Sequence, residues 1–218
     1  MSPPGKRGKY LGFVAHEIKN PLATALWSCD LLKRMEPADR TGERAEKMVD
    51  VSLRALRRMR RLIDDFFTIE RLLEHGYDLK REKVAVRDLV EPAMKLLAEK
   101  DGISTEGWVA ELDDAATAGD AEMLRRAMRA ALEHMARGPA AKSRLSIAAR
   151  AENGKPALHI KAESPPSPVV PPDPEERQSG DPLGGVLGFA LAARILAAHG
   201  GSIQERDGGL WLVFPEAS

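Results

Sequence analysis

The apolar residues in the first third of the chain recur at helical spacing. Between residues 9 and 35 they fall every three or four positions, which predicts an amphipathic helix. A second pattern covers residues 43–75 and resembles a heptad seam. The apolar positions are Leu11, Val14, Ile18, Leu22, Ala25, Cys29 and Leu32, then Met48, Val51, Ala55, Met59, Leu62, Phe66, Ile69 and Leu73. These patterns predict a helical hairpin over residues 1–76. Because one hairpin has a single face to bury, we expect a homodimer in which two hairpins form a four-helix bundle.

After residue 76 the pattern changes to short strands that alternate with helices. Helices are predicted at 87–100, 120–137 and 183–199, and strands within 77–86 and at 106–112, 145–149, 157–162, 202–204 and 210–214. Asn153-Gly154 and Asp207-Gly208 are signals for tight hairpin turns. We therefore predict an α+β chain, with the hairpin followed by a two-layer α/β sandwich over residues 77–218.

Composition and charge exclude several classes of partner. The 218 residues carry 33 basic and 33 acidic side chains, so no global field favours nucleic acid or an anionic membrane. The single cysteine, Cys29, excludes an internal disulfide and suits a reducing compartment. No apolar run approaches the ~18 residues of a membrane span. We expect a cytoplasmic protein with no membrane anchor, no nucleic-acid partner and no sensor domain before residue 16.

Residues 13–23 carry the strongest chemical signal: Phe-Val-Ala-His-Glu-Ile-Lys-Asn-Pro-Leu-Ala. An exposed imidazole such as that of His16 is a good nucleophile near neutral pH, and the neighbouring Glu17 can orient it or act as a base. Asn20 follows one helical turn later on the same face and can position a water or a phosphoryl group. Pro21 removes a backbone donor and is expected to loosen or bend the helix.

This run resembles the phosphoacceptor box of two-component histidine kinases. The resemblance implies that His16 is phosphorylated on a ring nitrogen, that Glu17 acts as the base, and that Asn20 assists dephosphorylation of the partner. It implies that the hairpin dimerises and exchanges phosphate with the receiver domains of response regulators. The second helix also carries the basic cluster Arg54, Arg57, Arg58, Arg60 and Arg61. That cluster is either a solvated face or a docking surface for an acidic partner.

The second domain resembles the ATP-binding domain of the same kinases, a sandwich of the Bergerat (HATPase) type. One point of resemblance is Gly119-Asp120, with Leu124 and Met128 behind it on the next helix. The other is the stretch 187–203, which resembles the last glycine-rich box and the helix that follows it.

Three positions depart from that family pattern. His134 stands where the family has a magnesium-binding asparagine, and imidazole is a poor magnesium ligand. Glu163 replaces the adenine-reading aspartate and is followed by prolines instead of glycines. The last box keeps Gly184 and Gly188 but has Val186 at its middle glycine. We therefore expect no useful binding of ATP or magnesium, and no other metal site is evident.

The leading hypothesis is a histidine phosphotransferase that relays phosphate through His16 between receivers, with an upstream hybrid kinase as a candidate donor. One alternative is an active soluble histidine kinase with a divergent ATP site. The other is a pseudokinase scaffold that binds receivers without passing phosphate. Three histidines remain. His75 is interpreted as a helix-end residue, His159 as a strand residue and His199 as a packing residue at a helix end, and His75 lies outside the residues described below.

Overall fold

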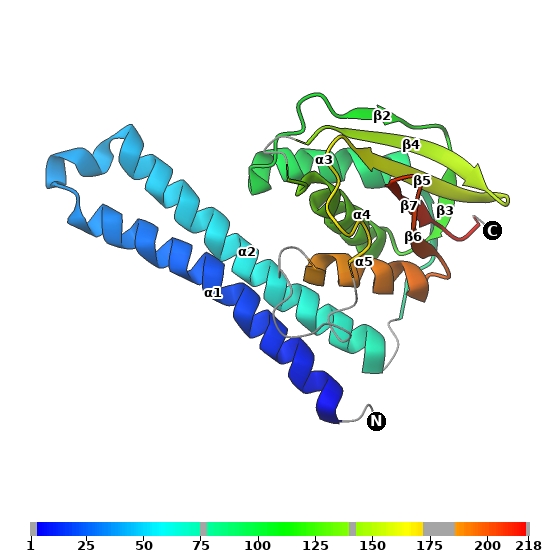
Figure 1. The fold of residues 1–218 in the computed structure, drawn as a ribbon, viewed down its shortest axis with the longest axis horizontal. Coiled ribbons are helices and arrows are strands. Elements are labelled where there is room, and N and C mark those ends of the chain that lie inside the picture. Colours follow the sequence, from blue (N-terminus) through cyan, green and yellow to red (C-terminus); the bar gives the residue numbers. More distant parts are fainter. Residues whose placement is uncertain (1–3, 75–77, 140–142, 172–185, 217–218) are drawn as a thin grey trace. The chain divides into compact units, whose positions relative to one another are not determined.

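The computed structural model describes residues 4–74, 78–139, 143–171 and 186–216 (Figure 1). The chain divides into two compact units, residues 1–67 and 68–218. Each unit is described by itself below. The predicted domain boundary between residues 76 and 77 lies outside the described residues and stays a prediction.

The first unit is the predicted helical hairpin. It consists of α1 (Pro4–Arg34), the short 3₁₀ helix η1 (Pro37–Thr41) and α2 (Glu43–Glu74). α1 continues through Pro21 as one helix, and the loosening or bend predicted there stays a prediction. Arg40 in η1 donates from Nε to the carbonyl of Met35 and from Nη2 to that of Lys33, both at 3.1 Å. These bonds satisfy carbonyls that the end of α1 leaves without helical partners.

Small side chains form the contact between α1 and α2. Ala25 and Ser28 on α1 are buried, as are Ala45, Ser52 and Ala55 on α2. Many of the large apolar side chains of the hairpin are exposed instead. They are Leu11, Leu22, Leu26 and Trp27 on α1, and Val49, Leu53, Leu56, Ile63 and Phe67 on α2. No helix among the described residues combines the length and apolar character that a membrane span requires.

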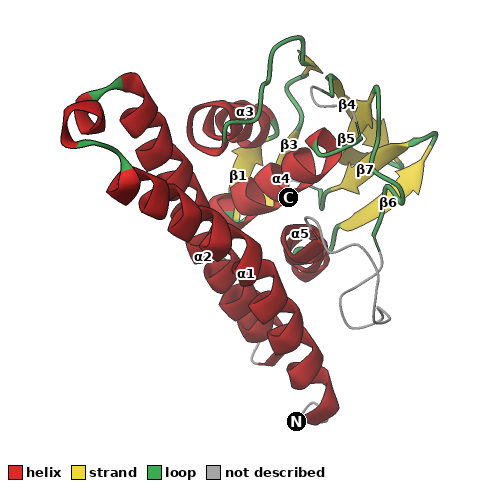
Figure 2. Ribbon diagram, turned by 60° about the vertical axis from the view of Figure 1, so that its left-hand side comes forward, coloured by secondary structure: helices red, strands yellow, loops and turns green. Residues whose placement is uncertain are grey.

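The second unit is a two-layer sandwich of helices on a sheet (Figure 2). Its elements are β1 (Glu82–Ala85), α3 (Arg87–Asp101), β2 (Val109–Glu111), β3 (Ala116–Gly119), α4 (Ala121–Ala136), β4 (Leu145–Glu152), β5 (Lys155–Ala162), α5 (Val186–Ala198), β6 (Ser202–Arg206) and β7 (Gly209–Val213). The five-stranded sheet has the order β2-β4-β5-β7-β6, in which only the β2–β4 pair is parallel. In both views α3, α4 and α5 lie on the same side of this sheet.

Tight turns join two of the strand pairs where the sequence predicted them. Asn153 and Gly154 have φ of 51° and 80°, and Asp207 and Gly208 have φ of 52° and 68°. Two successive positive φ values fit the twist of a hairpin. The strand β3 was not predicted, because its sequence, Ala-Thr-Ala-Gly, has low strand propensity. It forms by antiparallel pairing with β1 in a separate two-stranded sheet.

The core of the second unit lies between the helices and the sheet. Cross-strand neighbours Ile147, Ile160 and Leu210 are fully buried and line the inner face of the sheet. The helices contribute Leu89, Leu97, Leu124, Met128 and Leu132, which are also buried. Each such side chain contributes roughly 2 kcal/mol through its removal from water. This packing fixes the positions of α4 and α5. These two helices carry the positions compared with a nucleotide site.

The last turns of α2 belong to the second unit. Ile69 is fully buried there, and Thr68 is nearly so. Arg126 on α4 donates from Nη1 to the Thr68 hydroxyl at 3.1 Å. The end of this long helix is therefore part of the core of the second unit.

Candidate functional site: His16 and the positions compared with a nucleotide site

The middle of α1 presents His16 to solvent. Val14, Pro21 and Ala25 are buried on one side of the helix, whereas His16 and Asn20 are exposed. Residues four apart lie on the same helical face, so Asn20 stands one turn from His16, as the sequence predicted. The Thr24 hydroxyl donates to the backbone carbonyl of Asn20 at 3.1 Å, so this bond does not involve the Asn20 side-chain amide. An exposed imidazole with an amide beside it can accept a bulky phosphorylated partner.

Glu17 points away from this face. Its side chain is only 6% exposed, and its Oε2 lies 3.9 Å from Nη2 of Arg58 on α2. Consecutive helical residues point about 100° apart, so Glu17 faces the hairpin interior while His16 faces outward. The role predicted for Glu17, as a base or orienting group for His16, stays a prediction. Arg58 is a site residue that sequence reasoning identified only as one of a basic cluster.

The arginines of the basic cluster on α2 differ in their exposure to solvent. Arg54, Arg57 and Arg60 are exposed, whereas Arg58 and Arg61 are half-buried. The exposed three leave positive charge on the surface of α2. This arrangement is compatible with both interpretations given above, a solvated face and a docking surface.

In the second unit, His134 fills the space at the end of α4. It is buried, and its Nε2 donates to the carbonyl of Val169 at 2.8 Å. Its ring packs on that of Phe189 of α5, with 4.7 Å between centroids. Burial lowers the pKa of His134 below 6.5, the Val169 carbonyl opposes that shift, and the charge of Arg137 adds to it. The position predicted to have lost a magnesium ligand is therefore occupied by a neutral ring bonded to the protein's own backbone.

Glu163, at the end of β5, lies on the surface. Its carboxylate is 3.9 Å from Nη1 of Arg144, and both side chains are more than half exposed. Its backbone N–H donates to the Arg144 carbonyl at 3.1 Å. The next residue, Ser164, runs directly against Gly138, where an added Cβ would lie 1.6 Å from the Ser164 carbonyl oxygen. The chain after β5 is thus held against the end of α4.

The last glycine-rich box is only partly described. Gly184 lies outside the described residues, and so does the side chain of Val186, where α5 begins. Gly188 lies on α5, and a Cβ there would meet only the Ala130 Cβ, at 3.7 Å. Gly188 therefore serves ordinary packing between α4 and α5, with no close backbone approach that requires glycine.

His199 has a larger structural role than the predicted packing. Its Nε2 accepts the backbone N–H of Asp120 at 3.0 Å, and its Nδ1 donates to the Ile195 carbonyl at 2.7 Å. Asp120 in turn caps α4 by accepting the Met123 N–H at 3.1 Å. A Cβ on Gly119 would lie 2.7 Å from the His199 ring. The Gly119-Asp120 pair was the sequence signal for this arrangement. The glycine leaves room for the His199 ring, and the aspartate caps α4.

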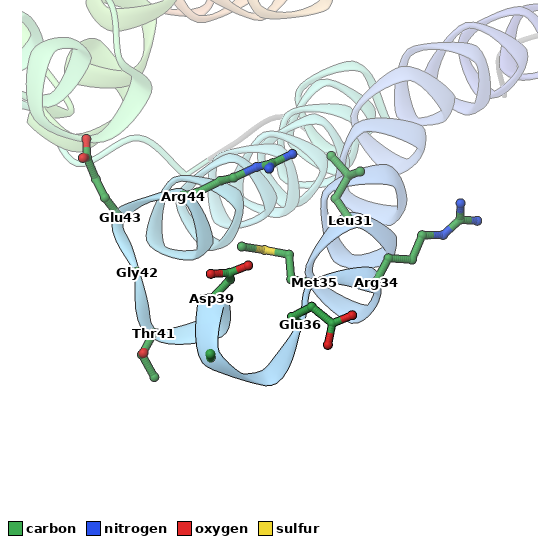
Figure 3. Close-up of a pocket in the computed structure, with 10 residues that line it drawn as sticks. Leu31, Arg34, Met35, Glu36, Asp39, Thr41, Gly42, Glu43 and Arg44 are labelled. Atoms are coloured by element: carbon green, nitrogen blue, oxygen red, sulfur yellow. The ribbon is translucent and has the colours of Figure 1, made fainter.

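A pocket of about 620 Å³ lies at the other end of the hairpin (Figure 3). It is lined by the end of α1, by η1 and by the start of α2, including Met35, Asp39 and Arg44. At ~1.5 Å per residue, Arg34 lies about 27 Å along α1 from His16, so this pocket is remote from His16. Among the described residues, no three His, Cys, Asp or Glu side chains gather as a metal site.

Comparison with known proteins identifies the first unit. Residues 6–74 match the His Kinase A (phospho-acceptor) domain. The sequence is 23% identical over 214 residues to the sensor protein VanS of Enterococcus faecium. The chain is therefore similar to histidine kinases, most specifically in the phospho-acceptor domain at residues 6–74. The alignment covers 93% of this chain but 54% of VanS, so the chain spans about half the length of that relative.

Solved structures of histidine kinases share the fold. The Acinetobacter baumannii histidine kinase AdeS superposes with a TM-score of 0.65 at 17% identity, over 93% of this chain and 98% of that one. Full-length ShkA, solved in complex with AMPPNP, gives a TM-score of 0.54 at 18% identity, over 95% of this chain and 46% of ShkA. The predicted fold, a helical hairpin followed by a HATPase-like α/β sandwich, is confirmed.

We expect the free energy of unfolding of this protein to fall as the pH drops from about 7.5 to 5.5. The folded-state pKa of His134 lies below its ordinary value of 6.5, so the unfolded chain binds the proton more readily. The stabilisation is complete above that ordinary value and is lost as the pH falls. Urea unfolding followed by circular dichroism at several pH values measures the slope.

Two glutamine substitutions test whether His134 causes this pH dependence, one at His134 itself and one at His159 as the control. His134→Gln should flatten it. His159→Gln should change it less, because His159 is part-exposed, although partial burial and Lys161 also lower its pKa. A slope that survives His134→Gln unchanged would show that His134 does not contribute it.

Proposed function

We propose that this protein is a histidine phosphotransferase of a cytoplasmic phosphorelay. His16 accepts a phosphoryl group from the aspartyl phosphate of one receiver domain and passes it to another. The observation that carries the proposal is the exposure of His16 and Asn20 on one face of α1. In the forward step a ring nitrogen forms the new N–P bond, the acyl O–P bond breaks, and the aspartate leaves as a carboxylate. The donor is already activated, so this chain supplies no nucleotide.

The residues at the nucleotide positions do not fit magnesium and ATP. A magnesium ion needs oxygen ligands in a tight octahedron, and His134 offers a nitrogen that already donates to Val169. An adenine-reading carboxylate needs to face a pocket, whereas that of Glu163 is 63% exposed beside Arg144. These two observations support a second unit that serves as a docking platform instead of a kinase domain.

Receiver domains of response regulators are the proposed partners, with a hybrid kinase as one source of phosphate. Receivers carry an acidic pocket around the phosphorylated aspartate, and exposed arginines on α2 offer the opposite charge. Arg54, Arg57 and Arg60 are the exposed members of the basic cluster. We place receiver docking against this side of the hairpin. A fourfold rise in salt concentration should therefore weaken the association mainly through its on-rate.

A second copy of the chain is proposed to cover the exposed apolar stripe of the hairpin. On α2 the stripe runs through Val49, Leu53, Leu56, Ile63 and Phe67, with steps that follow a heptad. α1 covers the neighbouring stripe of α2, at Ala45, Ser52 and Ala55, and leaves this one open. An apolar stripe of this length, beside a matching one on α1, is typical of a bundle interface.

We expect Leu53→Glu combined with Leu56→Glu to convert the dimer into monomers. Two charges in the stripe would have to be buried unpaired in the bundle, and each costs several kcal/mol. Sedimentation velocity at micromolar concentration measures the change. The matched control is Leu96→Glu on α3, which is similarly exposed but lies in the second unit. A native protein that is monomeric, or a double variant that stays dimeric, would contradict the proposed bundle.

Two other functions compete with this proposal. An active kinase with a divergent ATP site is favoured by the relatives, since VanS is named a sensor protein and AdeS a histidine kinase. A pseudokinase scaffold would bind receivers without using His16. Labelling by ATP distinguishes the first alternative, and the His16→Ala variant distinguishes the second.

A further inference from the structure

The sheet of the second unit has a face that α3, α4 and α5 do not cover, since all three lie on its other side (Figure 2). Ile160 of β5 and Leu210 of β7 are paired neighbours that face these helices. Successive residues of a strand point to opposite faces. His159 and Trp211, which are also paired with each other, therefore lie on the side without helices, called here the outer face.

A half-buried indole lies in the inner part of this outer face. The Trp211 ring stacks on that of His159 with 4.6 Å between centroids, and the Arg206 Cζ lies 6.0 Å from the Trp211 centroid. Arg206 also pairs with the Glu152 carboxylate and donates to the side chain of Gln204. A cation on an indole, with a second ring stacked on it, defines the orientation of that indole. Tryptophan and arginine in such a setting often carry the binding energy of protein interfaces.

The nitrogen of the Trp211 ring needs an acceptor. Its Nε1–H is buried and has no hydrogen-bond partner within residues 4–74, 78–139, 143–171 and 186–216, and the same holds for Nε2 of His159. An indole nitrogen donates and does not accept. A buried donor without an acceptor is costly, and a ligand that brings an oxygen to the ring edge removes that cost. The ring therefore favours a ligand with acceptor oxygens.

Basic side chains surround the two rings. By the same alternation along the strands, Arg150 of β4 and Lys155 and Lys161 of β5 lie on the outer face, and all three are exposed. Burial lowers the pKa of His159, and the charge of Lys161 lowers it further. Asp207 opposes that lowering, whereas Arg150 adds to it. The charges of both β4 and β5 thus reach the ring.

Acidic residues are fewer on this face. Glu152 is 15% exposed in its pair with Arg206, and Glu111 lies on β2, at the edge of the sheet. An excess of positive charge around a donor that needs an oxygen matches a carboxylate. The outer face mixes both signs and the whole chain has no net charge, so a short acidic protein segment fits better than a membrane or a nucleic acid.

We propose that the outer face binds a short acidic segment of a partner protein. One carboxylate of that segment accepts the Trp211 Nε1–H and pairs with Arg206, which exchanges its contact with Glu152 for one with the partner. Further carboxylates of the segment meet Arg150 and Lys161.

The spacing of the lysines sets the length of this segment. Lys155 and Lys161 lie six residues apart on β5, which is about 20 Å at ~3.3 Å per residue. An extended segment of about six residues covers that span. The binding involves no chemistry at His16, so the inference stands independently of the function proposed above.

The experiment uses the full chain and a fluorescein-labelled octapeptide of alternating glutamate and serine. A peptide of alternating glutamine and serine is its uncharged control. Fluorescence anisotropy measures the affinity, and ¹H–¹⁵N NMR follows the indole N–H signals, with that of Trp211 assigned by its loss in Trp211→Phe. We expect the acidic peptide to shift the Trp211 signal. The signal of Trp108, whose Nε1 already donates to the Ser143 carbonyl at 3.1 Å, should stay in place.

Four variants test the roles of the side chains. Trp211→Phe keeps a stacked ring but loses the donor, so it should weaken binding about tenfold. Arg206→Gln should weaken it about fivefold through the loss of a charged contact. Glu152→Gln removes the internal competitor for Arg206 and should tighten binding about threefold. Lys100→Gln removes an exposed charge from α3, on the other side of the sheet, and should leave the affinity unchanged.

The opposite results overturn the inference. A Trp211 signal that does not move, or a Trp211→Phe variant that binds as tightly, would show that the indole serves the fold alone. Equal binding of the uncharged peptide would exclude recognition of carboxylates. Loss of binding in the combined variant Arg54→Gln, Arg57→Gln, Arg60→Gln, with Trp211→Phe unaffected, would place the acidic segment on α2. Tighter binding of phosphatidylserine vesicles or of oligo-dT would replace the protein partner. Circular dichroism confirms folding, and Glu152→Gln decides the matter if Trp211→Phe unfolds.

Discussion

We expect that replacement of His16 by alanine will abolish phosphoryl transfer from a phosphorylated receiver, with a loss of about 10³-fold or more. The reason is that the substitution removes the nucleophile itself, and removal of a nucleophile leaves only background reactivity. His134 and His199 cannot replace it, because both are buried and hydrogen-bonded to backbone groups. The measurement is the acid-labile, base-stable label on the chain after incubation with ³²P-labelled receiver domains.

The matched control is another histidine changed to alanine. His159 is part-exposed in β5 and stacks on Trp211, with 4.6 Å between ring centroids. His159→Ala should keep its label, since that ring lies on a strand of the second unit. If His16→Ala kept full function in cells, the scaffold interpretation would replace the relay.

Substitution of Gly138 by alanine should destabilise the second unit by about 3 kcal/mol. A Cβ at this position would lie 1.6 Å from the carbonyl oxygen of Ser164, which belongs to the backbone and cannot rotate away. The end of α4 and the chain after β5 would have to separate, and such overpacking costs up to several kcal/mol. Urea unfolding monitored by circular dichroism gives the difference in the free energy of unfolding.

Gly188→Ala is the matched control for that experiment. The added methyl group would meet only the Ala130 Cβ, at 3.7 Å, and alanine favours a helix by up to about 1 kcal/mol over glycine. We therefore expect no loss of stability. A neutral Gly138→Ala would mean that the chain after β5 is not held against α4. A destabilised Gly188→Ala would mean that α4 and α5 pack more closely than described.

Much of the fold, and the helical face that carries His16 and Asn20, was predictable from local patterns. Helical spacing predicted the hairpin, and the i, i+4 relation placed His16 and Asn20 on one exposed face. Turn chemistry predicted the pair Asn153-Gly154. In each case the information lies within a few consecutive residues, where backbone geometry alone relates sequence to structure.

Contacts between distant segments were not predictable in the same way. The pairing of Glu17 with Arg58 depends on the register of α1 against α2, which the small residues at their contact determine. The bond from His134 to Val169 depends on the path of an irregular segment after β5. β3 was missed because its pairing with β1, instead of its own composition, makes it a strand. Periodicity identifies buried positions, but it does not name their partners.

On the function proposed here, His16 receives its phosphoryl group from receiver domains and not from ATP. Two parallel incubations of the full chain test it, one with magnesium and γ-³²P-labelled ATP, the other with a ³²P-labelled receiver domain. We expect acid-labile label on His16 from the receiver alone, and no label on His16→Ala in either incubation. Acid-labile label on His16 from ATP in the absence of any other kinase would contradict it and establish an active kinase.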